Sequence, residues 1–263
     1  MSLRWPFGMR RGGMRNRLIV ALDVGSVDEA LDLVDRLTAE VGMFKVGKQL
    51  FVHAGPQIVR SIRERGGEVF LDLKFHDIPR TVAKAAGEAT RMGVRMFDVH
   101  ASGSLEMMQR TIAEVNKVCR AEGLRRPKVL AVTVLTSLDR DDLKLVGVAA
   151  GVQSQVVRLA RLAKEAGMDG VVASPLEIVP IRKECGHGFA IVTPGVRMRE
   201  GTWEDQKRAN TPEAAIRAGA DYLVIGQPIR EASDPAQAAR DIVAAMERGL
   251  GPPDRRRQQE SKL

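Results

Sequence analysis

Cysteine is scarce in this 263-residue sequence, which contains only Cys119 and Cys185. Two cysteines so far apart supply neither a disulfide framework nor a cluster of zinc ligands. Apolar runs are also short, and none approaches the roughly 18 residues that a transmembrane helix needs. Residues 1–17 lack the apolar segment of a secretory signal. We therefore expect a protein of the reducing cytoplasm that has no disulfide and no membrane span.

The body of the chain has little net positive charge, because most of the excess of basic over acidic residues lies at the two ends. The formal net charge is +8, of which residues 1–17 contribute +5 and residues 251–263 contribute +2. A basic face for nucleic acid is therefore not predicted on the folded body. The ends lack a periodic apolar pattern, which predicts a disordered basic extension over residues 1–16 and a disordered tail over residues 249–263. Two alternatives stay open for these ends: binding of RNA or another acidic surface, and a peroxisomal address in the final Ser-Lys-Leu.

A glycine-rich dinucleotide fingerprint is missing as well. After the first predicted strand the sequence reads DVGSVDEA, which argues against a doubly wound open sheet, the main rival fold. Present instead are apolar runs rich in Val, Ile and Phe that alternate with amphipathic segments. The predicted strands are 17–24, 43–48, 68–74, 95–101, 128–135, 170–174, 190–195 and 222–227. Several are continuously apolar, as strands covered on both faces should be, so we predict a single (β/α)8 barrel over residues 17–248.

Charged residues gather where these strands end, which is where barrel enzymes build their active sites. The strand ends hold Asp23, Lys45, Asp72, Lys74, Asp98, His100, Thr136, Arg197 and Gly226. The densest group lies in FLDLKFHDIPRT, residues 70–81. Side chains alternate along a strand, so Asp72 and Lys74 should point to the same side. With Lys45 from the preceding strand and Asp77 from the loop, they predict an alternating array of two ammonium groups and two carboxylates.

Several interpretations of this array remain open from spacing alone. It could be a structural salt-bridge cluster, although burying four charges costs several kcal/mol per ion and more often marks chemistry. Asp72 and Asp77 could bind magnesium, but Lys74 lies between them and argues against it. A Schiff-base lysine would need a depressed pKa, whereas flanking carboxylates raise it. His76 and His100 are interpreted as packing or hydrogen-bonding histidines rather than metal ligands.

The motifs then identify a family. DLKFHDIP, together with ALDV, FKVGKQLF, AVTVLTS, TPGVR and ANTPEAAIRAGADYLVIG, resembles bacterial orotidine 5'-monophosphate decarboxylases over residues 16–248. A related group, 3-keto-L-gulonate 6-phosphate decarboxylase and hexulose-phosphate synthase, shares the Asp-x-Lys-x-x-Asp core but depends on magnesium. The Ile78-Pro79 pair favours the orotidylate branch. The resemblance implies conversion of orotidine 5'-monophosphate to UMP and CO2, the last step of de novo pyrimidine nucleotide synthesis, without a cofactor or metal.

The same resemblance implies residue roles and a homodimer. Lys74 would stabilise and protonate the carbanion, and Asp72 would lie near the substrate carboxylate. Lys45 and the partner subunit's Asp77 would hold the array in register and, with Asp23, bind the ribose hydroxyls. Thr81 would also reach into the partner subunit's site.

Further roles concern the base and the phosphate. Thr136 would contact the base, with an ordinary strand-end hydroxyl as the alternative. Arg197, Gln206 and the backbone amides of Gly226 and Gln227 would bind the phosphate after strands seven and eight, the usual place on this fold.

One position departs from the family pattern. Where the family reads Ile-Gly-Arg, this sequence reads Ile-Gly-Gln, so Gln227 replaces the expected phosphate-binding arginine. Arg230 or Arg197 could compensate. A catalytically silent barrel that serves as an interaction protein would explain Gln227 as decay. The intact set of Lys45, Asp72, Lys74 and Asp77 argues against decay.

Overall fold

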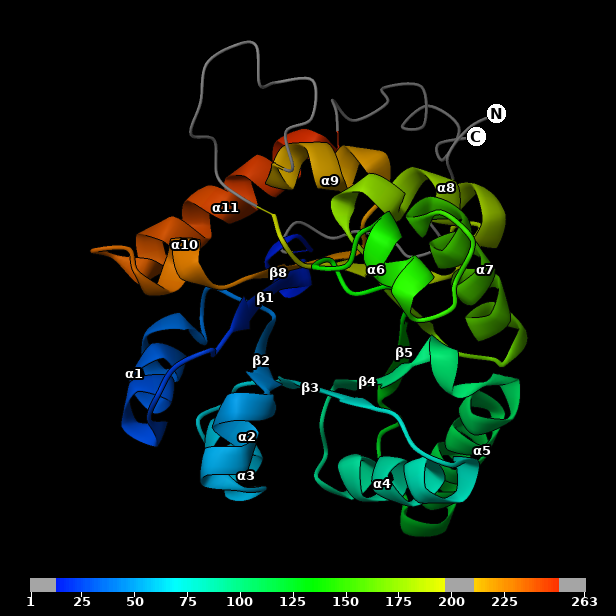
Figure 1. Ribbon diagram of the computed structural model, residues 1–263. Coiled ribbons are helices and arrows are strands. Elements are labelled where there is room, and N and C mark those ends of the chain that lie inside the picture. Colours follow the sequence, from blue (N-terminus) through cyan, green and yellow to red (C-terminus); the bar gives the residue numbers. More distant parts are fainter. Residues whose placement is uncertain (1–12, 197–210, 251–263) are drawn as a thin grey trace, which may run out of the picture.

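Eight parallel strands form a closed barrel in the computed structural model, which describes residues 13–196 and 211–250 (Figure 1). Each strand pairs with the next, and β1 pairs with β8, so no strand edge is left open. The strands are β1 (Leu18–Ala21), β2 (Met43–Gly47), β3 (Val69–Phe75), β4 (Met96–His100), β5 (Lys128–Val132), β6 (Gly170–Val172), β7 (Ala190–Thr193) and β8 (Tyr222–Ile225). The predicted (β/α)8 barrel is thus confirmed.

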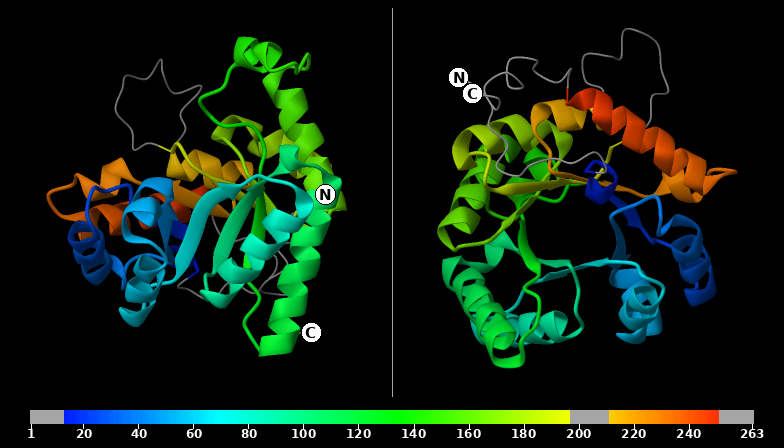
Figure 2. Two further views of the ribbon diagram at one scale, coloured as in Figure 1. Left: turned by 60° about the horizontal axis from the view of Figure 1, so that its bottom comes forward. Right: turned by 180° about the vertical axis from the view of Figure 1, so that it is seen from behind.

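Helices surround the strands on the outside, as two further views also show (Figure 2). They are α1 (Val27–Leu37), α2 (Lys48–Ala54), α3 (Gln57–Glu64), α4 (Pro79–Arg91), α5 (Leu105–Glu122), α6 (Arg140–Leu145), α7 (Val152–Glu165), α8 (Ile178–Cys185), α9 (Pro212–Ala218), α10 (Gln227–Arg230) and α11 (Pro235–Gly249). Short 3-10 turns occur at η1 (Arg15–Arg17), η2 (Ala101–Gly103) and η3 (Pro175–Glu177). None of the helices in the described ranges is long and apolar enough to cross a membrane.

Local sequence explains where many helices begin and end. The side chains of Ser26 and Thr211 accept backbone N–H groups at the starts of α1 and α9, and Pro79 is the first residue of α4. The glycines that follow α3, α4 and α7, which are Gly66, Gly93 and Gly167, all have φ between +71° and +80°. These values lie in the left-handed region, where glycine avoids the steric cost of a side chain.

The structure differs slightly from the predicted barrel boundaries. Met14 is buried in the core and is followed by η1, so the ordered chain begins before residue 17. An apolar side chain can dock on the barrel without any periodic pattern around it, which is why the sequence did not indicate it. At the other end, α11 continues to Gly249. The rest of the two predicted tails, residues 1–12 and 251–263, lies outside the described residues.

The strand interiors explain why the charged side chains inside the barrel lie at its carboxyl end. Inside the barrel, Met43, Phe70 and Met96 on β2, β3 and β4 form a buried apolar layer with inward residues of other strands. Two residues further along the same strands stand Lys45, Asp72 and Asp98. Because side chains alternate with a period of two, all three share the inward face of the barrel. The apolar layer therefore lies directly beneath a layer of charged side chains at the carboxyl ends of the strands.

The amino-terminal end of the barrel is held by buried ion pairs. Arg182 on α8, whose side chain is 8% exposed, contacts the Asp221 carboxylate at 2.7 Å. Its guanidinium also donates to three backbone carbonyls, those of Gly186, Phe189 and Gly219. Asp221 in turn accepts the N–H of Ile191 at 2.8 Å. The pair thus links α8 and the segments that precede β7 and β8.

We predict that Arg182→Leu lowers the free energy of unfolding by about 3–5 kcal/mol, because it leaves a largely buried carboxylate without its cation. Urea denaturation followed by circular dichroism measures this change. The matched control is Arg217→Leu, since Arg217 is 62% exposed and pairs with Glu213 on the surface, where such pairs contribute about 0–1 kcal/mol. Equal losses in the two variants would contradict the structural role of Arg182.

Candidate active site

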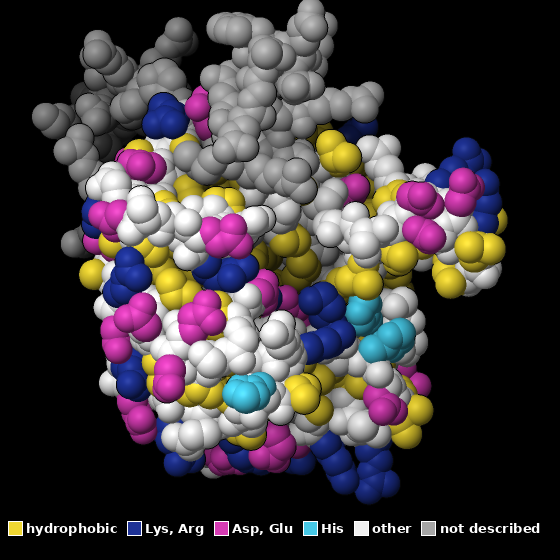
Figure 3. Space-filling view, turned by 60° about the vertical axis from the view of Figure 1, so that its left-hand side comes forward, with side chains coloured by type: hydrophobic (Ala, Val, Ile, Leu, Met, Phe, Trp, Pro, Cys, Tyr) yellow, Lys and Arg dark blue, Asp and Glu magenta, His cyan; other side chains and the backbone are white. Residues whose placement is uncertain are grey.

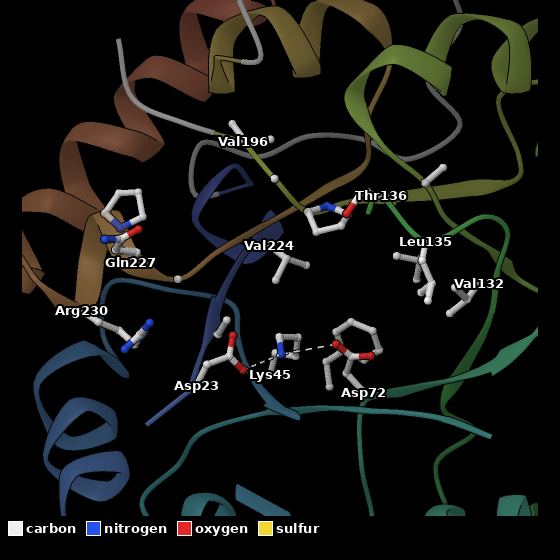
Figure 4. A pocket seen from close by; sticks show the side chains of 18 of the residues that line it. Asp23, Lys45, Asp72, Val132, Leu135, Thr136, Val196, Val224, Gln227 and Arg230 are labelled. Carbon is white, nitrogen blue, oxygen red and sulfur yellow. Dashed lines mark hydrogen bonds and ion pairs between the residues drawn. The ribbon is translucent and has the colours of Figure 1, made fainter. Parts of the chain in front are cut away.

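A cavity of about 1120 Å³ opens at the carboxyl ends of the strands. Its floor carries Asp23, Lys45, Asp72 and Lys74, from the segment after β1 and from β2 and β3. Thr136 lines one wall, and Gly226 and Gln227 line another (Figure 4). Seven of the predicted site residues therefore surround one cavity. Arg197 and Gln206, also predicted for this site, lie outside the described residues.

The floor charges alternate in sign. The Lys45 ammonium lies 2.9 Å from the Asp23 carboxylate and 3.3 Å from the Asp72 carboxylate (Figure 4). The Lys74 ammonium contacts the other oxygen of Asp72. The side chains of Lys45 and Asp72 are only 11% and 13% exposed. Gly47 leaves room for this arrangement, because a Cβ there would lie 3.1 Å from the Lys45 nitrogen. The predicted same-side placement of Asp72 and Lys74 is thus observed.

Mutual pairing keeps these buried groups ionised. Burial by itself lowers the pKa of Lys45, but the carboxylates of Asp72 and Asp23 outweigh it and raise the pKa above its usual value. Burial likewise acts to raise the pKa of Asp72, but Lys45, Asp98 and Lys74 together lower it. The raised pKa of Lys45 and the lowered pKa of Asp72 therefore favour the charged forms of these two residues at the cavity.

Lys74 has an unusual backbone. Its φ is +52°, in the left-handed region that residues other than glycine rarely adopt. The register between β3 and β4 shifts between Leu71 and Phe75, which indicates a β-bulge in β3. Such strained residues concentrate at functional sites, where the surrounding structure holds them in place. The bulge gives a further reason, beyond simple strand alternation, for the direction of the Lys74 side chain.

Asp77 and Thr81 do not join the array within one chain. The Asp77 carboxylate accepts the N–H of Ile78 at 2.6 Å, and the side chains of Asp77 and Thr81 are exposed at the start of α4. Neither residue lines the cavity. Within the single chain, the alternating array is made of Asp23, Lys45, Asp72 and Lys74, without Asp77. A role of Asp77 and Thr81 in a partner subunit remains a prediction.

The cavity wall formed by α10 carries Arg230, which the sequence suggested only as a possible substitute for the phosphate-binding arginine missing at Gln227. Gln227 turns its side-chain amide to Glu231, donating to the carboxylate at 2.8 Å. Arg230, one turn later, extends its guanidinium into the cavity (Figure 4). Its Nε atom is buried and has no hydrogen-bond partner among the residues described. Arg230 is therefore available to an anion at this wall, whereas Gln227 is engaged elsewhere.

The histidines beside the array pack together. The ring centroids of His76 and His100 lie 5.2 Å apart. Burial, followed by the charges of His76, Lys48 and Lys74, lowers the pKa of His100 to about 4. His100 is therefore neutral at physiological pH, which agrees with its interpretation as a packing or hydrogen-bonding residue.

Comparison with known proteins identifies the family. The model of the orotidine 5'-phosphate decarboxylase / HUMPS family matches residues 16–242. The chain belongs to this family. It is 53% identical over 241 residues to orotidine 5'-phosphate decarboxylase of Geotalea daltonii, covering 92% of this chain and 100% of the relative. It is 55% identical over 236 residues to the protein of the same name from Syntrophotalea carbinolica, covering 90% of this chain and 97% of the relative.

Solved structures agree with the family assignment. The crystal structure of orotidine 5'-phosphate decarboxylase from Lactobacillus acidophilus has a TM-score of 0.78 and 34% sequence identity to this chain, and covers 87% of this chain and 98% of its own. The family match thus extends over the whole barrel that carries the charged floor. The resemblance inferred from the DLKFHDIP motif set is confirmed.

Proposed function

We propose that this protein decarboxylates orotidine 5'-monophosphate to UMP and CO2 in pyrimidine nucleotide synthesis. The observation that carries the proposal is the alternating Asp23, Lys45, Asp72 and Lys74 array on the floor of the cavity. Family membership and the names of the relatives support this substrate. A structural salt-bridge cluster would not require the charges to line a cavity of this size.

The reaction needs a cation at the carbon that loses CO2. When the bond between C6 and the carboxylate carbon breaks, its electron pair stays on C6 in the plane of the ring, where no adjacent carbonyl delocalises it. A preorganised ammonium group lowers the energy of this anion more than it lowers that of the substrate. Lys74 supplies that ammonium and then transfers a proton to C6, and solvent restores its proton after the product has formed.

The other members of the array hold this ammonium in place. Asp72 accepts from both Lys45 and Lys74, so it fixes the distance between the two cations. It also faces the cavity, and we place the substrate carboxylate beside it. Asp23 and Lys45, at the edge of the array, bind the ribose hydroxyls, and Thr136 on the opposite wall contacts the base.

We place the phosphate at the wall made by α10. Gly226 and Gln227 line it with backbone, and Arg230 supplies the side-chain cation. Arg197 and Gln206 complete this end of the site in the proposal. We further propose that the protein is a cytoplasmic homodimer in which each subunit lends Asp77 and Thr81 to its partner's site. Their exposure next to Ile78, an apolar side chain that is also exposed, supports this arrangement.

The decisive experiment follows the absorbance of orotidine 5'-monophosphate after addition of the purified protein, with and without EDTA. Loss of substrate absorbance that is unaffected by EDTA supports the proposal. Activity that EDTA abolishes would favour a magnesium-dependent decarboxylase or aldolase of the same family. Absence of turnover at saturating substrate would favour a silent barrel that serves as an interaction protein.

For Lys74 we expect Lys74→Ala to reduce kcat by well over 100-fold, because a charge directed at the transition state is worth more than about 2.7 kcal/mol. The variant should keep its circular dichroism spectrum and its affinity for UMP within an order of magnitude. Lys117→Ala is the matched control, since Lys117 lies on the exposed side of α5, where it pairs with Glu114. A Lys74→Ala variant that retains more than about a hundredth of the activity would rule out this role.

For the shared site we expect subunit mixing to restore activity. Asp77→Ala and Lys74→Ala homodimers should each be inactive, but a heterodimer contains one site with both residues intact. Random exchange of equal amounts should therefore recover about a quarter of the parent activity, as a two-fold symmetric dimer requires. Each variant mixed with itself is the control. Exchanged mixtures that remain inactive would show that each site is built from one chain.

For the phosphate wall we expect Arg230→Leu to raise KM for orotidine 5'-monophosphate by about 10- to 150-fold, the range for a lost hydrogen bond to a charged group. Gln227→Arg should lower KM, because arginine offers a charge and a forked donor where glutamine offers a neutral amide. The effect on kcat should be smaller in both variants. Steady-state kinetics at low ionic strength measures these changes. If Arg230→Leu leaves KM unchanged and Gln227→Arg gives no gain, the phosphate does not bind at this wall.

A further inference from the structure

Asp98, on β4, is a buried acid that the proposed reaction does not yet use. Its side chain lies on the inward face of the barrel and is 0% exposed. One carboxyl oxygen, Oδ1, accepts the backbone N–H of Lys74 at 2.8 Å. The other, Oδ2, is buried, and no N–H or O–H group within residues 13–196 and 211–250 donates to it. A buried carboxylate oxygen without a donor is costly and requires an explanation.

The bond to Lys74 replaces a lost strand contact. Along β3, the register with β4 moves from Leu71, paired with Phe97, to Phe75, paired with Val99. Three residues of β3, Asp72 to Lys74, thus lie opposite the single residue Asp98. A bulge leaves backbone groups without partners in the ladder. The Asp98 side chain supplies the partner for Lys74 and so helps to hold its left-handed backbone.

The carboxyl group of Asp98 lies beside another acid. The carboxyl groups of Asp98 and Asp72 lie within hydrogen-bonding reach of each other. Two ionised carboxylates have only acceptors, so they can bond only if one of them carries a proton. Asp72 contacts the ammonium groups of both Lys45 and Lys74, whereas Asp98 makes no ion pair with any described residue. The proton therefore belongs on Asp98.

Electrostatics agrees with this assignment. Burial, and then the Asp72 carboxylate, raise the pKa of Asp98 well above its usual value, and the Lys74 ammonium only partly opposes them. The pKa of Asp72 is lowered. From β5, the residue paired with Asp98 is Leu130, which does not titrate. On β4 itself the nearest titratable group is His100, whose pKa is lowered to about 4 and which is neutral at pH 7.

We propose that Asp98 is a neutral carboxylic acid that positions the catalytic pair: its Oδ2–H donates to the Asp72 carboxylate while its Oδ1 accepts the Lys74 N–H. This bond holds Asp72 ionised and oriented between its two lysines, and it fixes the backbone from which the Lys74 ammonium projects. Asp98 is fully buried and is not among the residues that line the cavity, so it is a positioning residue. Only the kinetic consequence of this assignment rests on the proposed decarboxylation.

The first test is infrared difference spectroscopy of the unliganded protein. The spectrum of the parent minus that of Asp98→Asn at pH 7 should contain the carbonyl stretch of a protonated carboxylic acid, and this band should shift in D2O. Asp221→Asn is the matched control, because Asp221 also accepts the N–H of a strand residue but is ion-paired with Arg182. The control should remove only carboxylate bands. A carboxylate band, and no acid band, lost in Asp98→Asn would overturn the proposal.

The second test compares two substitutions in the orotidine 5'-monophosphate assay. Asparagine keeps an acceptor for Lys74 and a donor for Asp72 without a charge, whereas leucine keeps neither. We expect kcat of Asp98→Asn to exceed that of Asp98→Leu at least tenfold, with similar KM values in the two variants. Asp98→Asn as inactive as Asp98→Leu would mean that the position needs a charge. If Asp98→Leu does not fold, the infrared result still decides.

The third test is the pH dependence of stability. A buried acid with a raised pKa contributes stability below its unfolded pKa of about 3.9, and that contribution is lost as the pH rises toward the folded pKa. Asp98→Asn lacks this loss, so its Tm relative to the parent should increase between pH 4 and pH 8. His100 and the other titrating groups are common to both proteins, and the difference isolates Asp98. A constant Tm difference would contradict the neutral acid.

These tests separate the two proposals. The infrared and stability measurements use unliganded protein, so they hold whether or not the chain acts on orotidine 5'-monophosphate. A parent protein that shows the acid band but no turnover would leave Asp98 as assigned and would overturn the proposed function. A parent protein that converts the substrate but shows no acid band would support the proposed function and would overturn the assignment of Asp98.

Discussion

The site depends on one constraint, which is that charges brought into the barrel must neutralise one another. Moving an ammonium or a carboxylate out of water costs several kcal/mol, and close, well-oriented partners are needed to offset that cost. Lys45 meets this requirement with Asp23 and Asp72, and Asp72 meets it with Lys45 and Lys74. Removing Asp23 would leave Lys45 with one partner instead of two, and removing Lys74 would do the same to Asp72. The array is therefore a unit, and its order around the barrel follows from the alternation of sign.

The barrel supplies the rigidity that this unit needs. An apolar layer closes the interior below Lys45 and Asp72, so water reaches the charges only from the cavity side. At the opposite end, Arg182 and Arg126 pair with carboxylates that precede strands β8 and β6. Polar chemistry is thus confined to the two rims, while the wall between them is packed. Over the face shown in Figure 3, acidic and basic side chains are interspersed, in keeping with the small net charge of the body.

The bulge in β3 connects the scaffold to the chemistry. In a regular strand, the Lys74 N–H would donate to a backbone carbonyl of a neighbouring strand. Alternation alone would then determine the face on which its side chain lies. Instead, Lys74 adopts a left-handed conformation, and the side chain of Asp98 on the neighbouring strand accepts its N–H. The strain at Lys74 is thus held by a buried hydrogen bond from β4. A change on β4 that touches no substrate can therefore alter the position of the ammonium in the cavity.

The sequence by itself determined the architecture and most of the charged floor. Runs of apolar residues at regular spacing predicted all eight strands, because a closed parallel sheet is buried on both faces and each strand must be apolar. The position of Lys45, Asp72 and Lys74 at strand ends predicted that they meet, since all carboxyl ends of a barrel face one way. Spacing alone joined Asp77 to the array but did not determine from which subunit it would come, because loop residues have no period that fixes their direction. Only the tertiary structure decided the bulge at Lys74 and the partner of Asp98, because both depend on contacts between strands that are far apart in the chain. It also decided that Arg230 rather than Gln227 extends its side chain freely into the cavity, because that depends on the turn of a short helix.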